Sequence, residues 1–157
     1  MIRKATKDDL DRIIEITKAC AAFMISNKIF QWNEHYPNIA TFEKDDLNQN
    51  LYVLEIENKL IGCLVISNKM DEFYSKVKWL TANKNNIYLH RLAIDPEFQK
   101  KGVHSIIFSE FHRTFEKKGI LECRRTPELA DNLAIQKLWR DFNPVLIKKR
   151  CTFRKEL

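Results

Sequence analysis

Glycine and proline are scarce in this 157-residue sequence, which contains three glycines and four prolines. Linkers between domains are usually rich in glycine, serine or proline, and no such stretch occurs here. The sequence also has no internal repeat and no low-complexity tract. A chain of this length has the commonest size of one domain and buries enough surface to fold without disulfides or a structural metal. We therefore expect a single domain that spans residues 1–157.

Closely spaced cysteines are also lacking. Metal and redox motifs use close cysteine pairs, and no cluster of histidine, cysteine and carboxylate residues has the spacing of metal ligands. We therefore expect no metal and expect the cysteines to be reduced, buried thiols. They are Cys20, Cys63, Cys123 and Cys151.

Long apolar runs are missing as well. No segment approaches the ~20 apolar residues of a membrane-spanning helix. The opening Met-Ile-Arg-Lys lacks the apolar core of a signal peptide. The sequence therefore predicts a cytoplasmic protein without a membrane partner.

Basic residues exceed acidic ones, 27 to 21, and the formal net charge is +6. A positive charge attracts anionic partners over long distances, and a phosphate-rich small molecule satisfies that preference as well as a nucleic acid does. The sequence has neither a basic helix with base-reading side chains nor an aromatic stacking motif. We therefore do not expect a nucleic-acid partner.

Hydrophobic periodicity predicts an α+β fold with helices around a mixed central sheet. Thr6, followed three residues later by Asp9, predicts a helix start. The short turn at 57–59 between two apolar runs predicts a β-hairpin. The expected strands are 2–4, 51–56, 60–66, 87–94, 120–123, 145–147 and 151–153. One expected helix begins after Thr6. The other expected helices cover residues 21–30, 41–48, 102–118 and 129–142.

The segment after the expected strand 87–94 has the features of an anion site. The first turn of a helix has main-chain N–H groups without partners, and the helix dipole adds positive charge there. Gly102 allows phosphates to approach the main chain closely, and Lys100 and Lys101 add positive charge. The sequence therefore predicts a phosphate-binding loop at the start of the helix 102–118.

These residues resemble the pyrophosphate-binding motif of the GNAT family of N-acetyltransferases. In that family a strand with an apolar-x-apolar-x-Pro ending, here Leu92 to Pro96, precedes Gln/Arg-x-x-Gly-x-Gly/Ala. The resemblance covers nearly the whole chain, including the opening strand and the later segment that begins at Asn132. The segment from Gln31 to Pro37, the hairpin and the strand through His90 resemble an uncharacterised bacterial branch of the family.

The resemblance implies the GNAT fold, with the fourth and fifth strands splayed apart, and an enzyme that uses acetyl-CoA without a metal. It implies that the main chain of Leu92 and Ile94 pairs with the pantetheine arm and that Asn132 lies in the cofactor site. It further implies that a primary amine attacks the thioester directly. The main-chain N–H groups expected to hold the pyrophosphate are those of Gln99, Lys100, Lys101, Gly102, Val103 and His104.

Two positions depart from the family pattern. His104 stands where the family has glycine or alanine, so its side chain either crowds the phosphates or turns outward and adds a donor. Trp139 stands where the family has a tyrosine whose hydroxyl protonates the leaving thiolate, and an indole N–H is no practical acid. Trp139 also lies on an apolar helical stripe typical of core packing. The sequence therefore leaves two hypotheses, an active N-acetyltransferase and a catalytically weakened module that binds acyl-CoA or a protein.

The candidate base is His90, because imidazole side chains ordinarily titrate near neutral pH and suit the deprotonation of an ammonium. Alternatively, His90 has only a structural role in its strand. The resemblance places the aromatic segment after the first helices over the acceptor site, where an exposed cluster of aromatic and carboxylate side chains can enclose an amine. Anchoring of a long loop explains the same segment equally well. Its candidate substrate-binding residues are Trp32, Glu34, His35 and Tyr36.

The acceptor itself is not specified by the sequence, since acceptor loops vary freely on one fold. A small-molecule amine and a peptide amine both remain open. The expected C-terminal strands, 145–147 and 151–153, offer an edge for a homodimer.

Overall fold

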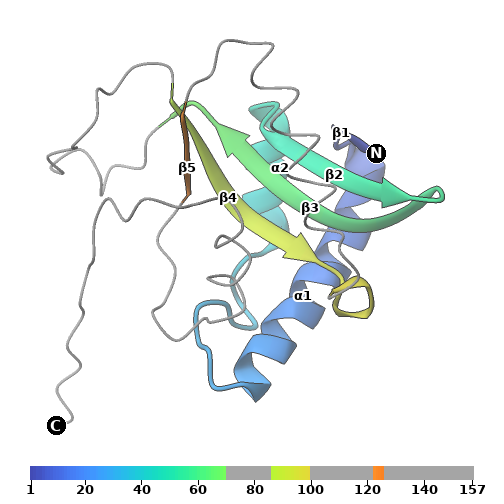
Figure 1. Ribbon diagram of the computed structural model, residues 1–157, viewed down its shortest axis with the longest axis vertical. Helices are drawn as coiled ribbons and strands as arrows, with labels where there is room; N and C mark the ends of the chain where they lie inside the picture. Colours follow the sequence, from blue (N-terminus) through green and yellow to red (C-terminus); the bar gives the residue numbers. More distant parts are fainter. Residues whose placement is uncertain (70–85, 100–121, 126–157) are drawn as a thin grey trace, which may run out of the picture.

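The computed structural model describes residues 1–69, 86–99 and 122–125 (Figure 1). Its elements follow in chain order: β1 (Ile2–Lys4), the 3-10 helix η1 (Lys7–Asp9), α1 (Leu10–Ser26), α2 (Ile39–Leu47), β2 (Leu51–Ile56), β3 (Lys59–Ser67), β4 (Asn86–Ile94), the 3-10 helix η3 (Pro96–Phe98) and β5 (Glu122–Arg125). The helices expected at 102–118 and 129–142 and the strands expected at 145–147 and 151–153 lie outside the described residues.

The described strands form one sheet in the order β1-β2-β3-β4-β5. Neighbours are antiparallel from β1 to β4, and β5 runs parallel to β4, so the sheet is mixed as predicted. The predicted hairpin between β2 and β3 is confirmed. Glu57 and Asn58 both have positive φ angles, 50° and 61°, which matches the twist that a two-residue hairpin turn requires.

The helix start predicted at Thr6 is confirmed, because η1 begins directly after Thr6 and continues into α1. The separate helix expected at 21–30 is wrong. α1 is one helix whose buried face continues without a break through Cys20 and Ala21. It ends at Ser26, and Lys28 then adopts a left-handed φ of 60° that turns the chain away.

The second helix begins slightly earlier than the predicted range 41–48. Asn38 caps α2 by accepting a hydrogen bond from the N–H of Thr41 at 3.0 Å. A side-chain acceptor at this position satisfies one of the unpaired donors of the first turn.

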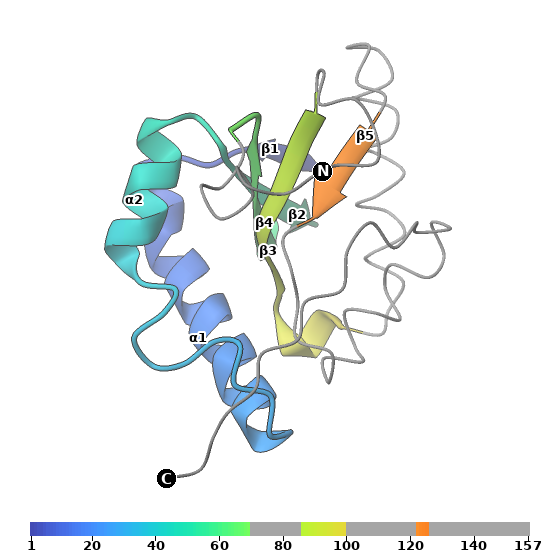
Figure 2. The same ribbon diagram turned by 90° about the vertical axis from the view of Figure 1, so that its left-hand side faces the viewer.

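Both described helices cover the same face of the sheet (Figure 2). The core between them contains Ile13 and Ile16 from α1, Phe42 from α2, and Val53 and Val65 from the sheet.

A second apolar cluster is built from β2, β3 and β4 on the other side of the sheet. Its members include Leu54, Leu64, Ile66, Ile87 and Leu89. Both faces of the central strands are therefore buried, which explains their nearly continuous apolar sequence.

β3 and β4 approach each other closely at Gly62. A Cβ atom at this position would lie 2.6 Å from the carbonyl oxygen of Ala93. A side chain is therefore excluded at Gly62 unless β4 shifts.

Cys20 and Cys63 are free and buried, as expected. Burial raises the pKa of Cys20 to about 11 and raises the pKa of Cys63 further. Both therefore remain thiols at neutral pH. The side chains of Cys123 and Cys151 lie outside the described part. Within the described ranges, no helix has the length and apolar character needed to cross a bilayer.

An ion network joins the first strand to the helix start and to β2. Arg3 donates to both carboxylate oxygens of Asp9 at 2.7 and 2.8 Å, and its Nη2 lies 2.5 Å from Glu55 Oε1. Asp9 also accepts from the N–H and the hydroxyl of Thr6 at 2.7 and 2.9 Å. The hydrogen bonds from Arg3 outweigh the opposing effect of burial and lower the pKa of Asp9 to about 2.

This lowered pKa predicts an acid-labile contribution to stability. The pKa of Asp9 is lower in the folded chain than in the unfolded chain, so its contribution is complete above the unfolded value of about 4 and is lost as the pH falls towards 2. We expect Asp9→Asn to lower the free energy of unfolding by about 2 kcal/mol at pH 7 and by almost nothing near pH 2. Denaturant unfolding at several pH values measures both quantities.

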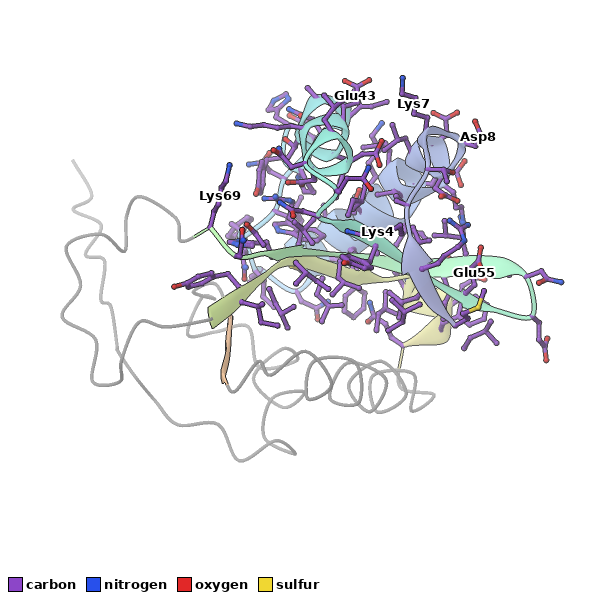
Figure 3. All side chains as sticks on the ribbon, turned by 90° about the horizontal axis from the view of Figure 1, so that it is seen from above. Lys4, Lys7, Asp8, Glu43, Glu55 and Lys69 are labelled. Carbon is purple, nitrogen blue, oxygen red and sulfur yellow. The ribbon has the colours of Figure 1, made fainter. Side chains whose placement is uncertain are left out.

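Asp8→Asn is the matched control, since Asp8 is exposed and projects from the outer side of the helix layer (Figure 3). It should change the free energy of unfolding by less than about 0.5 kcal/mol at every pH. An equal effect of the two substitutions would contradict the assignment to the Arg3 network.

Candidate active site

The centre of the candidate site is a β-bulge in β4. Val65 pairs with His90 and Cys63 pairs with Ala93, so two residues of β4, Arg91 and Leu92, lie opposite one residue of β3. Arg91 adopts a left-handed φ of 47°, as one residue of a bulge often does.

The bulge changes which side chains face each side of the sheet. Leu89 and Leu92 are three residues apart, yet both pack in the second cluster, away from the helices. A regular strand would place residues two apart on the same face.

The bulge is followed by a strand edge that faces away from β3. The N–H of Asp95 donates to Ile61 at 2.8 Å, so the main chain of Asp95 and Ala93 is directed towards β3. By the alternation of a strand, the main-chain groups of Leu92 and the N–H of Ile94 are directed towards the opposite edge. The carbonyl oxygen of Ile94 is already engaged, because it accepts from the side-chain amide of Gln99 and from the thiol of Cys20.

β5 occupies only the first part of that edge. Its pairing with β4 covers Asn86 to Leu89 and stops short of the bulge (Figure 1). Within the described part of the chain, no strand lies beside Leu92 and Ile94 on this side.

The turn after β4 is held in place by α1. Asp95 caps η3 by accepting from the N–H of Glu97 at 3.0 Å, and it also accepts from Arg12 Nη2 at 2.5 Å. Arg12 Nε donates to the carbonyl of Leu60 at 3.4 Å. The start of the predicted phosphate loop is therefore fixed to both a helix and the hairpin.

Gln99 closes the same turn. Its side-chain amide donates to the carbonyl of Ile94 at 2.8 Å, and the thiol of Cys20 lies 3.2 Å from that oxygen. The main-chain N–H of Gln99 was expected to bind the pyrophosphate. In this structure it is directed to the carbonyl of Pro96 at 3.4 Å. In this structure Gln99 shapes the loop through both its side chain and its main chain.

The chain between α1 and α2 is folded by the side chain of Asn33. Its Oδ1 accepts from the N–H groups of His35 and Tyr36 at 2.8 and 2.9 Å, and its own N–H donates to the carbonyl of Tyr36 at 3.0 Å. We refer to residues 33–36 as the 33–36 turn.

The sequence left two interpretations of Trp32, Glu34, His35 and Tyr36 open, an exposed cluster and the anchoring of a long loop. Trp32 is buried in the core beneath the helices, so its ring anchors the segment. Glu34, His35 and Tyr36 are exposed. The contact between the side chains of Glu34 and His35, at 3.2 Å, is open to solvent and adds little stability.

Arg91 connects the bulge to α2 and to the 33–36 turn. Its Nε and Nη2 bind the two carboxylate oxygens of Asp45 at 2.9 and 2.7 Å, and its Nη1 donates to the hydroxyl of Tyr36 at 3.2 Å. The side chains of Arg91 and Asp45 are 18% and 12% exposed. Burial raises the pKa of Asp45, and the positive charge of Arg91 opposes this effect.

His90 lies directly beside this network. It pairs with Val65, whose side chain belongs to the core under the helices, so His90 is on the helix-covered face of β4. Its side chain is partly exposed. The candidate base is therefore next to the bulge and on the same side of the sheet as the Asp45 carboxylate.

The family model of the acetyltransferase (GNAT) family matches residues 11–143, which is well over half of the sequence. The chain belongs to the GNAT acetyltransferase family. No curated protein sequence matches it.

Solved structures show the same fold. A GNAT-family acetyltransferase from Streptococcus agalactiae 2603 is 22% identical, with 90% of this chain and 82% of that chain covered and a TM-score of 0.78. The PaiA N-acetyltransferase from Thermoplasma acidophilum, in complex with coenzyme A, is 19% identical, with 90% and 87% covered and a TM-score of 0.66. An aminoglycoside acetyltransferase from an uncultured soil metagenomic sample, in complex with sisomicin, is 20% identical, with 100% and 95% covered and a TM-score of 0.57.

The family match and these likenesses confirm the predicted α+β GNAT fold. Two GNAT-like motifs, the phosphate loop after Gln99 and the segment that begins at Asn132, lie outside the described residues. The candidate residues concerned are Lys100, Lys101, Gly102, Val103, His104, Asn132 and Trp139.

Sequence reasoning missed Arg91, Asp45 and Asn33. A signal for Arg91 was present, because two polar residues in succession, His90 and Arg91, interrupt an otherwise apolar strand and indicate a bulge. No comparable signal identified Asp45, since its importance depends on a partner 46 residues away.

Asp95 holds the start of the predicted phosphate loop, so its removal should weaken that loop. Asp95→Ala removes the cap of η3 and the partner of Arg12, so the loop loses part of its fixed geometry. We expect the free energy of unfolding to fall by about 1–2 kcal/mol. Acetyl-CoA affinity should fall about five- to tenfold, as measured by calorimetry.

Glu97→Ala is the control, because it changes the exposed neighbouring carboxylate and leaves both contacts of Asp95 intact. Affinity for acetyl-CoA should then stay within about twofold of the wild-type value. If Asp95→Ala bound acetyl-CoA as tightly as this control, the cap would have no role in the loop.

Proposed function

We propose that this GNAT domain, spanning residues 1–157, transfers the acetyl group of acetyl-CoA to a primary amine by direct attack. The observation that carries the proposal is the edge of β4 at Leu92 and Ile94. The main-chain groups of Leu92 and the N–H of Ile94 face away from β3, and the pairing with β5 ends before them. The amide groups of a pantetheine arm can pair with such an edge as a neighbouring strand would.

The phosphate end of acetyl-CoA fits the sequence that follows this edge. The turn of residues 95–99 is fixed by Arg12, and it leads into the predicted helix start at Gly102. Main-chain N–H groups at a helix start favour a pyrophosphate. Here these donors include the N–H groups of Val103 and His104, and the side chains of Lys100 and Lys101 add positive charge. A structure of similar fold from Thermoplasma acidophilum is in complex with coenzyme A, which supports the choice of acyl donor.

The chemical step requires a neutral amine and a leaving thiolate. The amine nitrogen forms a bond to the acetyl carbonyl carbon, and the bond from that carbon to sulfur breaks. His90, or a water molecule that it orders, takes the proton of the amine. The thiolate needs little assistance from an acid, because a thiol pKa is near 8.5, and the reaction therefore tolerates Trp139 in place of tyrosine.

The exposed side chains of the 33–36 turn suit a cationic acceptor. Glu34 supplies a carboxylate and Tyr36 supplies an aromatic face, and both are attractive to an ammonium group. Because the charge of Arg91 is balanced by Asp45, the network behind the turn does not repel a positive acceptor. A structure of similar fold in complex with sisomicin supports an amine as the acceptor class.

Calorimetry with acetyl-CoA tests the cofactor site. Wild-type protein should bind acetyl-CoA in the micromolar range. Gly102→Trp should abolish binding, because the indole would occupy the space of the phosphates. Equal heats for the wild type and Gly102→Trp would contradict the assignment of this loop.

Release of free thiol across a panel of polyamines, amino sugars and lysine peptides then tests transfer. The second candidate function is a weakened acyl-CoA-binding module, which is favoured by Trp139 and His104. Trp139→Tyr separates the two. A large gain in rate would indicate that catalysis has been eroded at this position. An active wild type with an unchanged rate in Trp139→Tyr would support the enzyme, and acetyl-CoA binding without any product would support the module.

A further inference from the structure

We propose that Arg91 is a positioning residue that holds the 33–36 turn in a fixed relation to the bulge of β4. Arg91 would act on acceptor binding through this turn, without touching the acceptor itself. The inference rests on the proposed acetyltransferase function, and it adds a residue that the general chemistry of acetyl transfer does not require.

The main chain of Arg91 adopts a conformation that residues with a Cβ atom usually avoid. Its φ of 47° lies in the left-handed region, where glycine or asparagine is more usual. An arginine is retained at such a position when surrounding contacts over-determine its conformation. The contacts in this case come from the guanidinium group.

The guanidinium group binds two separate segments at once. Two of its nitrogens engage Asp45 on α2 in a bidentate pair, and the third donates to the hydroxyl of Tyr36 at 3.2 Å. Planar, forked donors allow arginine to satisfy a carboxylate and still reach another acceptor, which a lysine ammonium does not reproduce.

Fixing the hydroxyl of Tyr36 fixes the whole 33–36 turn. The main chain of Tyr36 is tied to Asn33 by two hydrogen bonds, one in each direction. Glu34 and His35 lie between these two residues and are exposed. Their side chains therefore keep a constant position relative to β4 as long as Arg91 holds Tyr36.

Arg91 also lies between the two sides of the proposed reaction. His90, the candidate base, precedes it, and Leu92, whose main chain faces the proposed cofactor edge, follows it. A single bulge residue thus links the turn that would receive the amine to the strand that would present the thioester.

A purely structural ion pair would have different consequences. The pair between Arg91 and Asp45 alone would hold α2 on the sheet, and the bond to Tyr36 would then have no effect on acceptor binding. Tyr36→Phe separates these cases, because it removes the hydroxyl and leaves the aromatic ring, the ion pair and the strand unchanged.

The first measurement is amide hydrogen exchange at Asn33, His35 and Tyr36, whose N–H groups are bonded within the turn. In Tyr36→Phe, exchange at these amides should be about three- to tenfold faster, the effect of losing one hydrogen bond. Arg91→Lys should produce the same change or a larger one. Tyr52→Phe on β2 is the matched control and should leave these rates unchanged.

The second measurement is steady-state kinetics with an amine from the panel. In Tyr36→Phe, the acceptor KM should rise about three- to tenfold, while kcat and the affinity for acetyl-CoA stay within about twofold. Unchanged exchange in the 33–36 turn overturns the inference. Faster exchange with an unaltered acceptor KM overturns it as well.

The exchange measurement needs no acceptor, so it is independent of the proposed function. If the wild type acetylates no amine and the turn still exchanges faster in Tyr36→Phe, the link from Arg91 to the turn is supported and the proposed function fails. If the wild type is active and the exchange rates do not change, the proposed function stands and the inference fails.

Discussion

The bulge at Arg91 is the constraint on which the rest of the site depends. One extra residue in β4 rotates the later half of the strand, so that Leu89 and Leu92 pack on the same face although three residues separate them. The same residue directs its guanidinium group to α2 and to the chain that follows α1. Without the bulge, the strand would continue in one register, and the residues that follow Arg91 would face the opposite sides of the sheet.

The two ends of the site are held by different means. At the carboxyl end of β4, Arg12 and Gln99 fix the turn with charged and amide donors, and the thiol of Cys20 adds a contact to Ile94. The 33–36 turn is instead shaped by local hydrogen bonds from Asn33 and by one distant contact from Arg91. A firmly held end at the proposed cofactor edge and a lightly held end at the proposed acceptor turn suit a fold whose acceptors vary.

Much of the fold could be predicted from the sequence, because local patterns dictate it. The short turn between two apolar runs, the helix start at Thr6 and the apolar run of β4 each indicate one element, and all three are confirmed. The length of α1 was mispredicted, because its end depends on a left-handed residue at Lys28 that no local rule requires. The sequence could not decide between exposure and anchoring for Trp32, and it did not indicate the pairing of Arg91 with Asp45, since both depend on how distant segments pack.

The proposed position of acetyl-CoA is along the edge of β4 beyond the bulge. Titration of isotope-labelled protein with acetyl-CoA, followed by amide chemical shifts in NMR, tests it most directly. We expect the largest shifts at Leu92, at Ile94 and in the turn of residues 95–99, with the amides around Asp9 unaffected. Saturable binding that leaves Leu92 and Ile94 unperturbed, or an absence of any binding, would contradict the proposal.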